Sequence, residues 1–168
     1  ILRLLKTGLV DLPDAQQCAL ENYAYTWQLT AADWRAPFTR SAAGYAGRDT
    51  EQDKQTLADA EAARAYLMER IAAFVPKASG APAAALTKQL YLFLESLGAE
   101  KTLDRLAEEL RVQGRLPDAD EALREWNVVM GLLDQLARLL GDEVFSPADY
   151  AELFTLLLRT TDMGHIPQ

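Results

Sequence analysis

One regular pattern of apolar residues, between residues 116 and 140, constrains the fold of this chain most. Its apolar positions recur at steps of three or four residues, at Leu123, Trp126, Met130, Leu133, Ala137 and Leu140. That spacing predicts one helix of about seven turns with a continuous apolar stripe. Pro117 and Asp118 suit the first turn, and Gly141 can take the left-handed conformation that ends a helix. Such a long amphipathic helix must be covered by several others.

The rest of the sequence also favours helices over strands. Hydrophobic residues make up 49% of the chain, mainly as Ala and Leu, while β-branched residues are scarce. Apolar periodicity and helix-end signals predict further helices over 1–9, 13–29, 49–75, 83–97, 100–112 and 147–160. Asp49 or Thr50 would cap the third of these, and Arg64 falls on its apolar stripe as an expected snorkelling residue. The sequence therefore predicts an all-α protein, an irregular multi-helix bundle of about six to seven helices.

We expect one helical domain over residues 1–168, because this length suffices for a single core. Within it, 1–48 would form N-terminal helices and a loop with a short turn near Asp33, 49–160 the main bundle, and 161–168 a tail. The chain opens with Ile1 rather than Met and stops at Ile-Pro-Gln. We interpret it as a piece excised from a larger chain.

The residues offer no catalytic, cofactor-binding or metal-binding constellation. The only histidine, His165, lies at the extreme end, and Cys18 lies among apolar residues of a predicted helix, where we expect a small core residue. The acidic clusters, including 108–109 and 118–121, fit helix ends and solvated faces. There is no phosphate-binding glycine loop, no membrane-spanning run and no signal peptide, so we expect a cytoplasmic protein without a membrane partner.

The segment 34–48 combines aromatic and basic residues and lacks acidic ones, although the chain as a whole has a net charge of −8. Its candidate DNA-contacting residues are Trp34, Arg35, Phe38, Arg40 and Arg48, with Tyr45 nearby. Aromatic rings stack on bases and arginines bind phosphates, so the segment suits single-stranded nucleic acid. Alternatively, Trp34 and Phe38 anchor a loop on the bundle, and the arginines pair with surplus acids.

Several stretches, taken in order, resemble one family. ILRLLKTGL resembles a "FRYLKTGL" segment and is followed by LENY at 20–23 and a Trp-x-x-Pro-Phe element at 34–38. The strings EWN at 125–127, LLDQL at 132–136 and LGDE at 140–143 continue the match, and GHIPQ resembles the start of an "IP-x-x-x-D-x-V" segment. This ordered set resembles the B subunit of the bacterial ATP-dependent helicase/deoxyribonuclease (AddB or RexB) over nearly the whole chain.

The resemblance implies a helical subdomain inserted in the second motor domain, in an enzyme that processes double-strand DNA ends for recombinational repair. Its partners would be DNA and the A subunit of the complex. ATP, magnesium and an iron–sulfur cluster are implied for the parent protein, but none of the family's active residues or cluster cysteines falls on this sequence. The alternative is a free-standing helical module that binds other proteins. A small helical enzyme lacks a candidate site.

Overall fold

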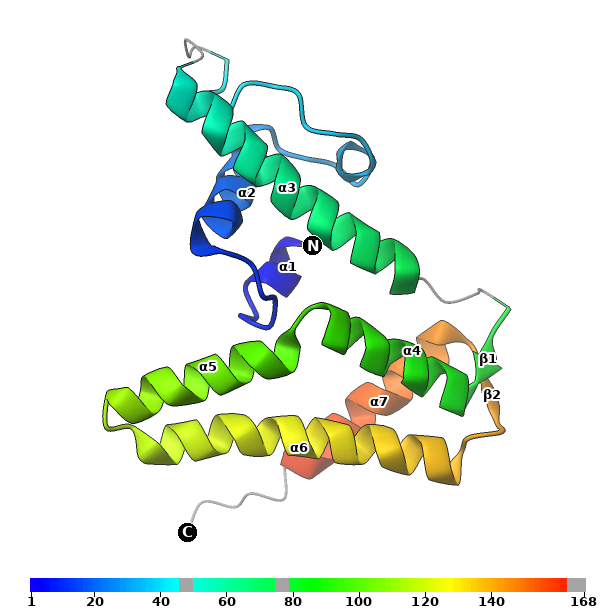
Figure 1. Ribbon diagram of the computed structural model, residues 1–168. Coiled ribbons are helices and arrows are strands. Elements are labelled where there is room, and N and C mark those ends of the chain that lie inside the picture. The colour runs from blue at the N-terminus through cyan, green and yellow to red at the C-terminus, as the bar shows by residue number, and fades with distance from the viewer. Residues whose placement is uncertain (46–49, 75–78, 163–168) are drawn as a thin grey trace. The chain divides into compact units, whose positions relative to one another are not determined.

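The computed structural model describes residues 1–45, 50–74 and 79–162, and its regular structure is almost entirely helical (Figure 1). These residues form seven α-helices, one short 3-10 helix and a single pair of two-residue strands, which confirms the all-α prediction. The chain divides into two compact units, residues 1–73 and 74–168. Each unit has buried apolar residues of its own and is described separately.

The first unit contains α1 (Leu2–Leu5), α2 (Asp14–Thr26), η1 (Asp33–Arg35) and α3 (Glu51–Phe74). α1 is shorter than the predicted helix over 1–9, because Gly8 has a left-handed conformation with φ of 70°. α3 begins where the sequence predicts. The Thr50 hydroxyl accepts the backbone N–H of Asp53 (3.2 Å), and the Asp53 carboxylate accepts the backbone N–H of Thr50 (2.9 Å). The alternative cap, Asp49, lies outside the described residues.

α3 lies in the same compact unit as the N-terminal segments. The predicted boundary at 48/49 had grouped it with the later helices instead. Its buried residues are Ala60, Ala63, Arg64 and Leu67, and α2 buries Ala19, Leu20, Tyr23 and Ala24. The prediction that Cys18 is a core residue is wrong, since its side chain is exposed. Successive helical residues differ by about 100° around the axis, so a position directly beside the buried Ala19 can face solvent.

The second unit contains β1 (Ala81–Pro82), α4 (Ala83–Ser96), α5 (Ala99–Val112), α6 (Leu116–Leu139), β2 (Val144–Phe145) and α7 (Pro147–Asp162). α5 and α6 form an antiparallel hairpin that turns at Gly114, whose φ is 77° (Figure 1). β1 and β2 pair in antiparallel fashion, with Ala81 opposite Phe145. β1 directly precedes α4 and β2 directly precedes α7, so the pairing of the two strands joins the starts of these helices.

α6 is the central helix of the second unit, as its apolar stripe predicts, and it packs against α4, α5 and α7. Leu136 of α6 joins Leu86 and Tyr150 in a buried cluster, where the hydroxyls of Thr87 and Tyr150 are hydrogen-bonded at 2.7 Å. The expected left-handed conformation of Gly141 is wrong, because its φ is not positive. Glycine is needed there for another reason: a Cβ at this position would collide with the backbone oxygen of Ala137.

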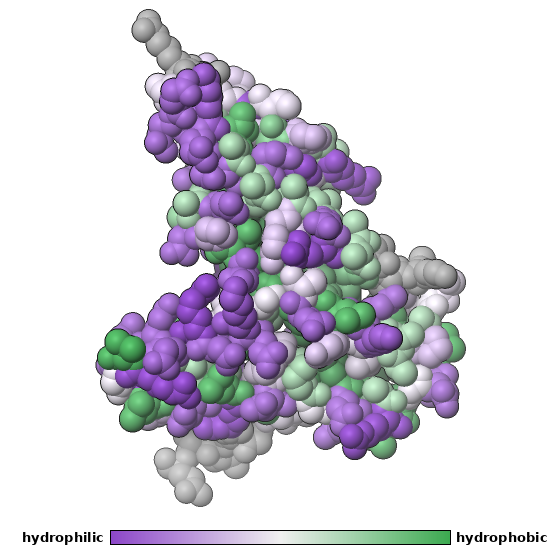
Figure 2. Space-filling view, viewed as in Figure 1, coloured by the Kyte–Doolittle hydropathy of each residue, from purple (hydrophilic) through white to green (hydrophobic). Residues whose placement is uncertain are grey.

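On the face of the second unit that Figure 2 shows, hydrophilic residues cover much of α5 and α6, and apolar residues gather at the outer end of this hairpin. Val112 and Leu116 are the exposed apolar residues at this turn. Across the described residues, no helix is both long and apolar enough for a membrane span.

Candidate nucleic-acid interface

The aromatic residues of the 34–38 loop lie inside the first unit. Trp34 of η1 and Phe38 are both buried, and their rings meet edge-on with centroids 5.9 Å apart. Phe38 also stacks on Tyr23 of α2, with centroids 4.4 Å apart. Buried rings cannot stack on a base in this conformation. For these two residues the geometry therefore matches the alternative in which they anchor the loop.

An ion pair on α3 holds the same loop from the other side. Arg64 donates from Nε and Nη2 to the two carboxylate oxygens of Glu61 (2.7 and 2.6 Å), and from Nη1 to the carbonyl oxygen of Trp34 (3.0 Å). Glu61 also accepts the backbone N–H of Phe38 at 2.8 Å. The hydrogen bonds from Arg64 lower the pKa of Glu61, and those to Glu61 raise the pKa of Arg64. The snorkelling prediction for Arg64 is wrong, because its head group is buried and paired rather than solvated.

Arg40 lies at the edge of this loop and is partly exposed. Its Nη2 pairs with Asp33 at 2.9 Å, its guanidinium lies 4.9 Å from the ring centroid of Trp27, and its backbone N–H donates to the Tyr23 hydroxyl. Asp33 accepts the hydroxyl and the backbone N–H of Thr30, and these bonds, more than Arg40, lower the pKa of its carboxyl group. Asp33 thus remains ionised at neutral pH and offsets part of the charge of Arg40.

Trp27, at the C-terminal end of α2, was not among the candidates predicted from the sequence. Its indole N–H donates to the carbonyl oxygen of Ser41 (3.1 Å), and the ring of Tyr45 meets it edge-on at 4.5 Å. Tyr45 is 89% exposed, so its ring faces solvent. The contact with Trp27 holds this ring in place. The only sign in the sequence of this contact between Trp27 and Tyr45 is that one aromatic residue directly follows a predicted helix and another lies in the next loop.

The remaining arginines of the candidate segment differ in how they are placed. Arg35 is exposed at the end of η1, where its backbone N–H donates to the carbonyl oxygen of Ala32 (3.1 Å), but its side chain has no hydrogen bond or ion pair within the described residues. Arg48 lies outside the described residues. The structure therefore brings Arg40 together with Trp27 and Tyr45, while Trp34 and Phe38 face inward.

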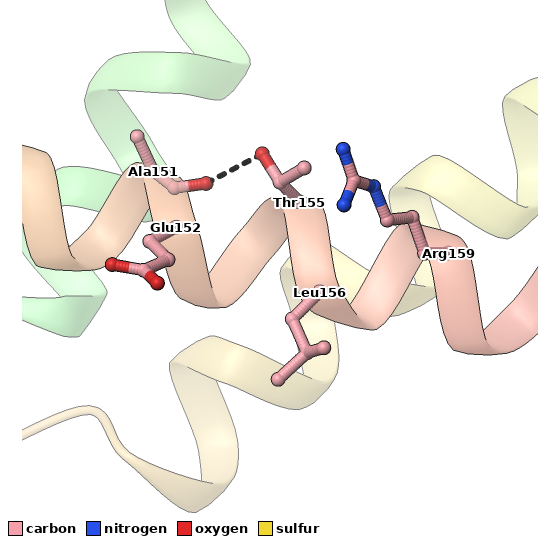
Figure 3. A pocket seen from close by; sticks show the side chains of 5 residues that line it. All are labelled: Ala151, Glu152, Thr155, Leu156 and Arg159. Carbon is pink, nitrogen blue, oxygen red and sulfur yellow. Dashed lines mark hydrogen bonds between the residues drawn. The ribbon is translucent and has the colours of Figure 1, made fainter.

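The hollows on the surface of the described residues do not bring together reactive side chains. A shallow hollow on α7 is lined by residues of that helix alone, namely Ala151, Glu152, Thr155, Leu156 and Arg159 (Figure 3). The Thr155 hydroxyl already donates to the backbone oxygen of Ala151 at 2.7 Å. Over the described ranges, no three His, Cys, Asp or Glu side chains come together as a metal site would require. The partly exposed loop of the first unit is thus the best candidate for a contact with a ligand.

Comparison with known proteins relates the chain to a helicase–nuclease. No protein-family model matches it. A curated protein of Alkaliphilus oremlandii, named as the B subunit of an ATP-dependent helicase/deoxyribonuclease, is 28% identical over 99% of this chain. Proteins of the same name from Acetivibrio thermocellus and from Clostridium botulinum (strain Hall) are 27% and 26% identical over the same share. The chain spans only 15% of the length of each. The resemblance predicted from the residues is confirmed.

Proposed function

We propose that this chain is a non-catalytic helical subdomain of the B subunit of a bacterial helicase–nuclease, which processes double-strand DNA ends for recombinational repair. The observation that carries the proposal is the similarity to proteins named for that subunit over 99% of the chain. The work of such a subdomain is mechanical: it shapes the DNA path and contacts the neighbouring parts of the complex, including a second subunit.

ATP, magnesium and an iron–sulfur cluster belong, on this proposal, to parts of the subunit other than this chain. Among the residues that the structure describes, no set of side chains fits a metal ion. Cys18 is the only cysteine in the sequence, and the described residues contain no cluster of metal-ligating side chains. On this proposal, the chain contributes through its surfaces.

The identity of the parent protein is tested by isolating the native polypeptide with an antibody raised against this chain. We expect a band far above 18.6 kDa that co-purifies with a second large subunit and degrades linear duplex DNA only when ATP is present. Covalently closed circular duplex is the control, because it has no end. A band near 18.6 kDa without such activity would refute the proposal and favour a free-standing interaction module.

We place the DNA contact of the subdomain at the 34–48 segment, with Arg35, Arg40 and Arg48 meeting phosphates and the buried Trp34 and Phe38 holding the backbone. Replacing Arg35 or Arg40 by Ala should weaken DNA binding. The slope of log K against log salt should fall by about 0.7–0.9 for each phosphate that the variant no longer neutralises.

Arg138→Ala is a matched control for these two changes, since Arg138 is an exposed arginine of the second unit, paired with Asp134 on the same helix. It should leave both affinity and salt slope unchanged. Equal effects of all three substitutions would show that only net charge matters.

A further inference from the structure

An exposed aromatic ring with a fixed support is the most unusual surface feature of the first unit. Tyr45 is 89% exposed, and its ring lies edge-on against Trp27 with centroids 4.5 Å apart. We propose that Tyr45, supported by Trp27, is a stacking platform for one base of single-stranded DNA, with Arg40 placed to meet the adjoining phosphate. This inference rests on the proposed function for its choice of DNA as the ligand.

Trp27 acts as the support because its own surroundings are already occupied. Its N–H is bonded to the Ser41 carbonyl oxygen, the Arg40 guanidinium lies 4.9 Å from its ring centroid, and the Tyr45 ring makes an edge contact with it, with centroids 4.5 Å apart. A T-shaped contact covers at most one side of the Tyr45 ring, and with 89% of this residue exposed a flat face remains accessible. A ring that is already ordered loses less conformational freedom when a base stacks on it.

The charge distribution favours a single strand over a duplex. Duplex binding depends on many phosphate contacts, and this chain has a net charge of −8 and one partly neutralised arginine beside the platform. Bases in a duplex are paired and stacked on each other, whereas a single strand can offer a base to an aromatic ring. Every base has such a face, so we expect little dependence on sequence.

A second exposed tyrosine in the same unit provides a comparison. Tyr25 of α2 is 86% exposed, but no ring contact holds it among the described residues. If exposure of an aromatic ring were sufficient, Tyr25 and Tyr45 would contribute equally to binding. If the support matters, only Tyr45 contributes.

The experiment measures binding of the 168-residue chain to a labelled oligo(dT) of roughly 12 nucleotides, within the site sizes of single-strand-binding folds, by fluorescence anisotropy at low salt. Tyr45→Ala should weaken binding roughly 5-fold or more, as loss of one stacked base implies. Tyr45→Phe should keep the affinity, and Tyr25→Ala should leave it unchanged. An abasic strand and a duplex of the same length should both bind more weakly than oligo(dT), because neither offers a free base to the ring.

Each other outcome overturns the inference in a distinguishable way. Unchanged affinity in Tyr45→Ala, or equal binding of the abasic strand, refutes stacking while the salt-dependent arginine contact stands. Equal loss in Tyr25→Ala and Tyr45→Ala refutes the supported platform. Absence of binding by the wild-type chain refutes a site in these residues, while the ATP-dependent assay of the native complex still decides the proposed function. Circular dichroism confirms that each variant is folded.

Discussion

Replacing Arg64 by Met tests how the 34–38 loop is held on α3. The substitution keeps an unbranched side chain of similar length but removes three hydrogen bonds, two to Glu61 and one to the Trp34 carbonyl oxygen. Glu61 keeps only its bond from the Phe38 backbone N–H. The loop then loses its charged anchor, while the space around the Arg64 stem stays filled.

The expected loss of stability follows from burial. The side chains of Arg64 and Glu61 are 10% and 29% exposed. Breaking a buried ion pair costs about 3–5 kcal/mol, but the partly exposed Glu61 can regain water, so we expect about 2–3 kcal/mol. For a unit of 73 residues this corresponds to a fall in melting temperature of about 8–24 °C.

Lys54→Met is the matched control, because Lys54 forms a pair with Glu51 on the same helix. That pair has the same spacing of three residues and the same separation of 2.6 Å, but its side chains are 62% and 90% exposed. It should change stability by no more than about 0.5 kcal/mol. Urea unfolding followed by tryptophan fluorescence measures both variants, since Trp34 lies beside the anchor. Equal losses for the two substitutions would refute the argument from burial.

Three further predictions concern stability. The pKa of Glu61 is lowered in the folded chain, so its contribution to the free energy of unfolding is present above the unfolded pKa and is lost as pH falls through the folded pKa. The urea midpoints of Glu61→Gln should therefore depend less on acid pH than those of the wild type. Tyr150→Phe leaves the buried Thr87 hydroxyl unpaired and should cost about 1–2 kcal/mol by urea unfolding, whereas adding Thr87→Val should recover part of that loss. Gly131→Ala should stabilise α6 by about 0.5–1 kcal/mol, because nothing crowds a Cβ there, whereas Gly141→Ala should lower the melting temperature.

Each of these three has a result that contradicts it. An unchanged acid dependence in Glu61→Gln would mean that other carboxylates, such as Asp53 with its lowered pKa, dominate acid unfolding. A full additive loss in the Tyr150 and Thr87 double variant would show that their hydroxyls are not coupled. Gly131→Ala and Gly141→Ala shifting the melting temperature in the same direction would refute the backbone-contact argument.

Local signals in the sequence predicted most of the helices. Thr50 caps α3, Ser146 accepts the backbone N–H of Asp149 at the start of α7, and Gly98 and Gly114 take positive φ at the predicted breaks. These features depend on residues within a few positions of one another. The strand pair at 81–82 and 144–145 was not predicted, because such short pairing depends on contacts between distant segments.

The candidate site was predictable only as a segment. The sequence indicated the composition of 34–48 but not which of its rings would be buried. That depends on Arg64 and Glu61, which lie far from Trp34 in sequence and gave no local sign of bonding to its loop. Trp27 was missed for the same reason, since its partners are brought to it by a loop without regular periodicity.

Tyr23 links the buried and exposed halves of this loop. Its ring stacks on Phe38, while its hydroxyl accepts the backbone N–H of Arg40 at 3.1 Å. Burial raises the pKa of Tyr23. The bond to its hydroxyl fixes the backbone from which the Arg40 side chain reaches toward Trp27. Anchoring of the loop and the proposed contact of Arg40 with DNA are therefore coupled. A loop released by Arg64→Met should hold Arg40 less firmly, although the substitution lies on another element.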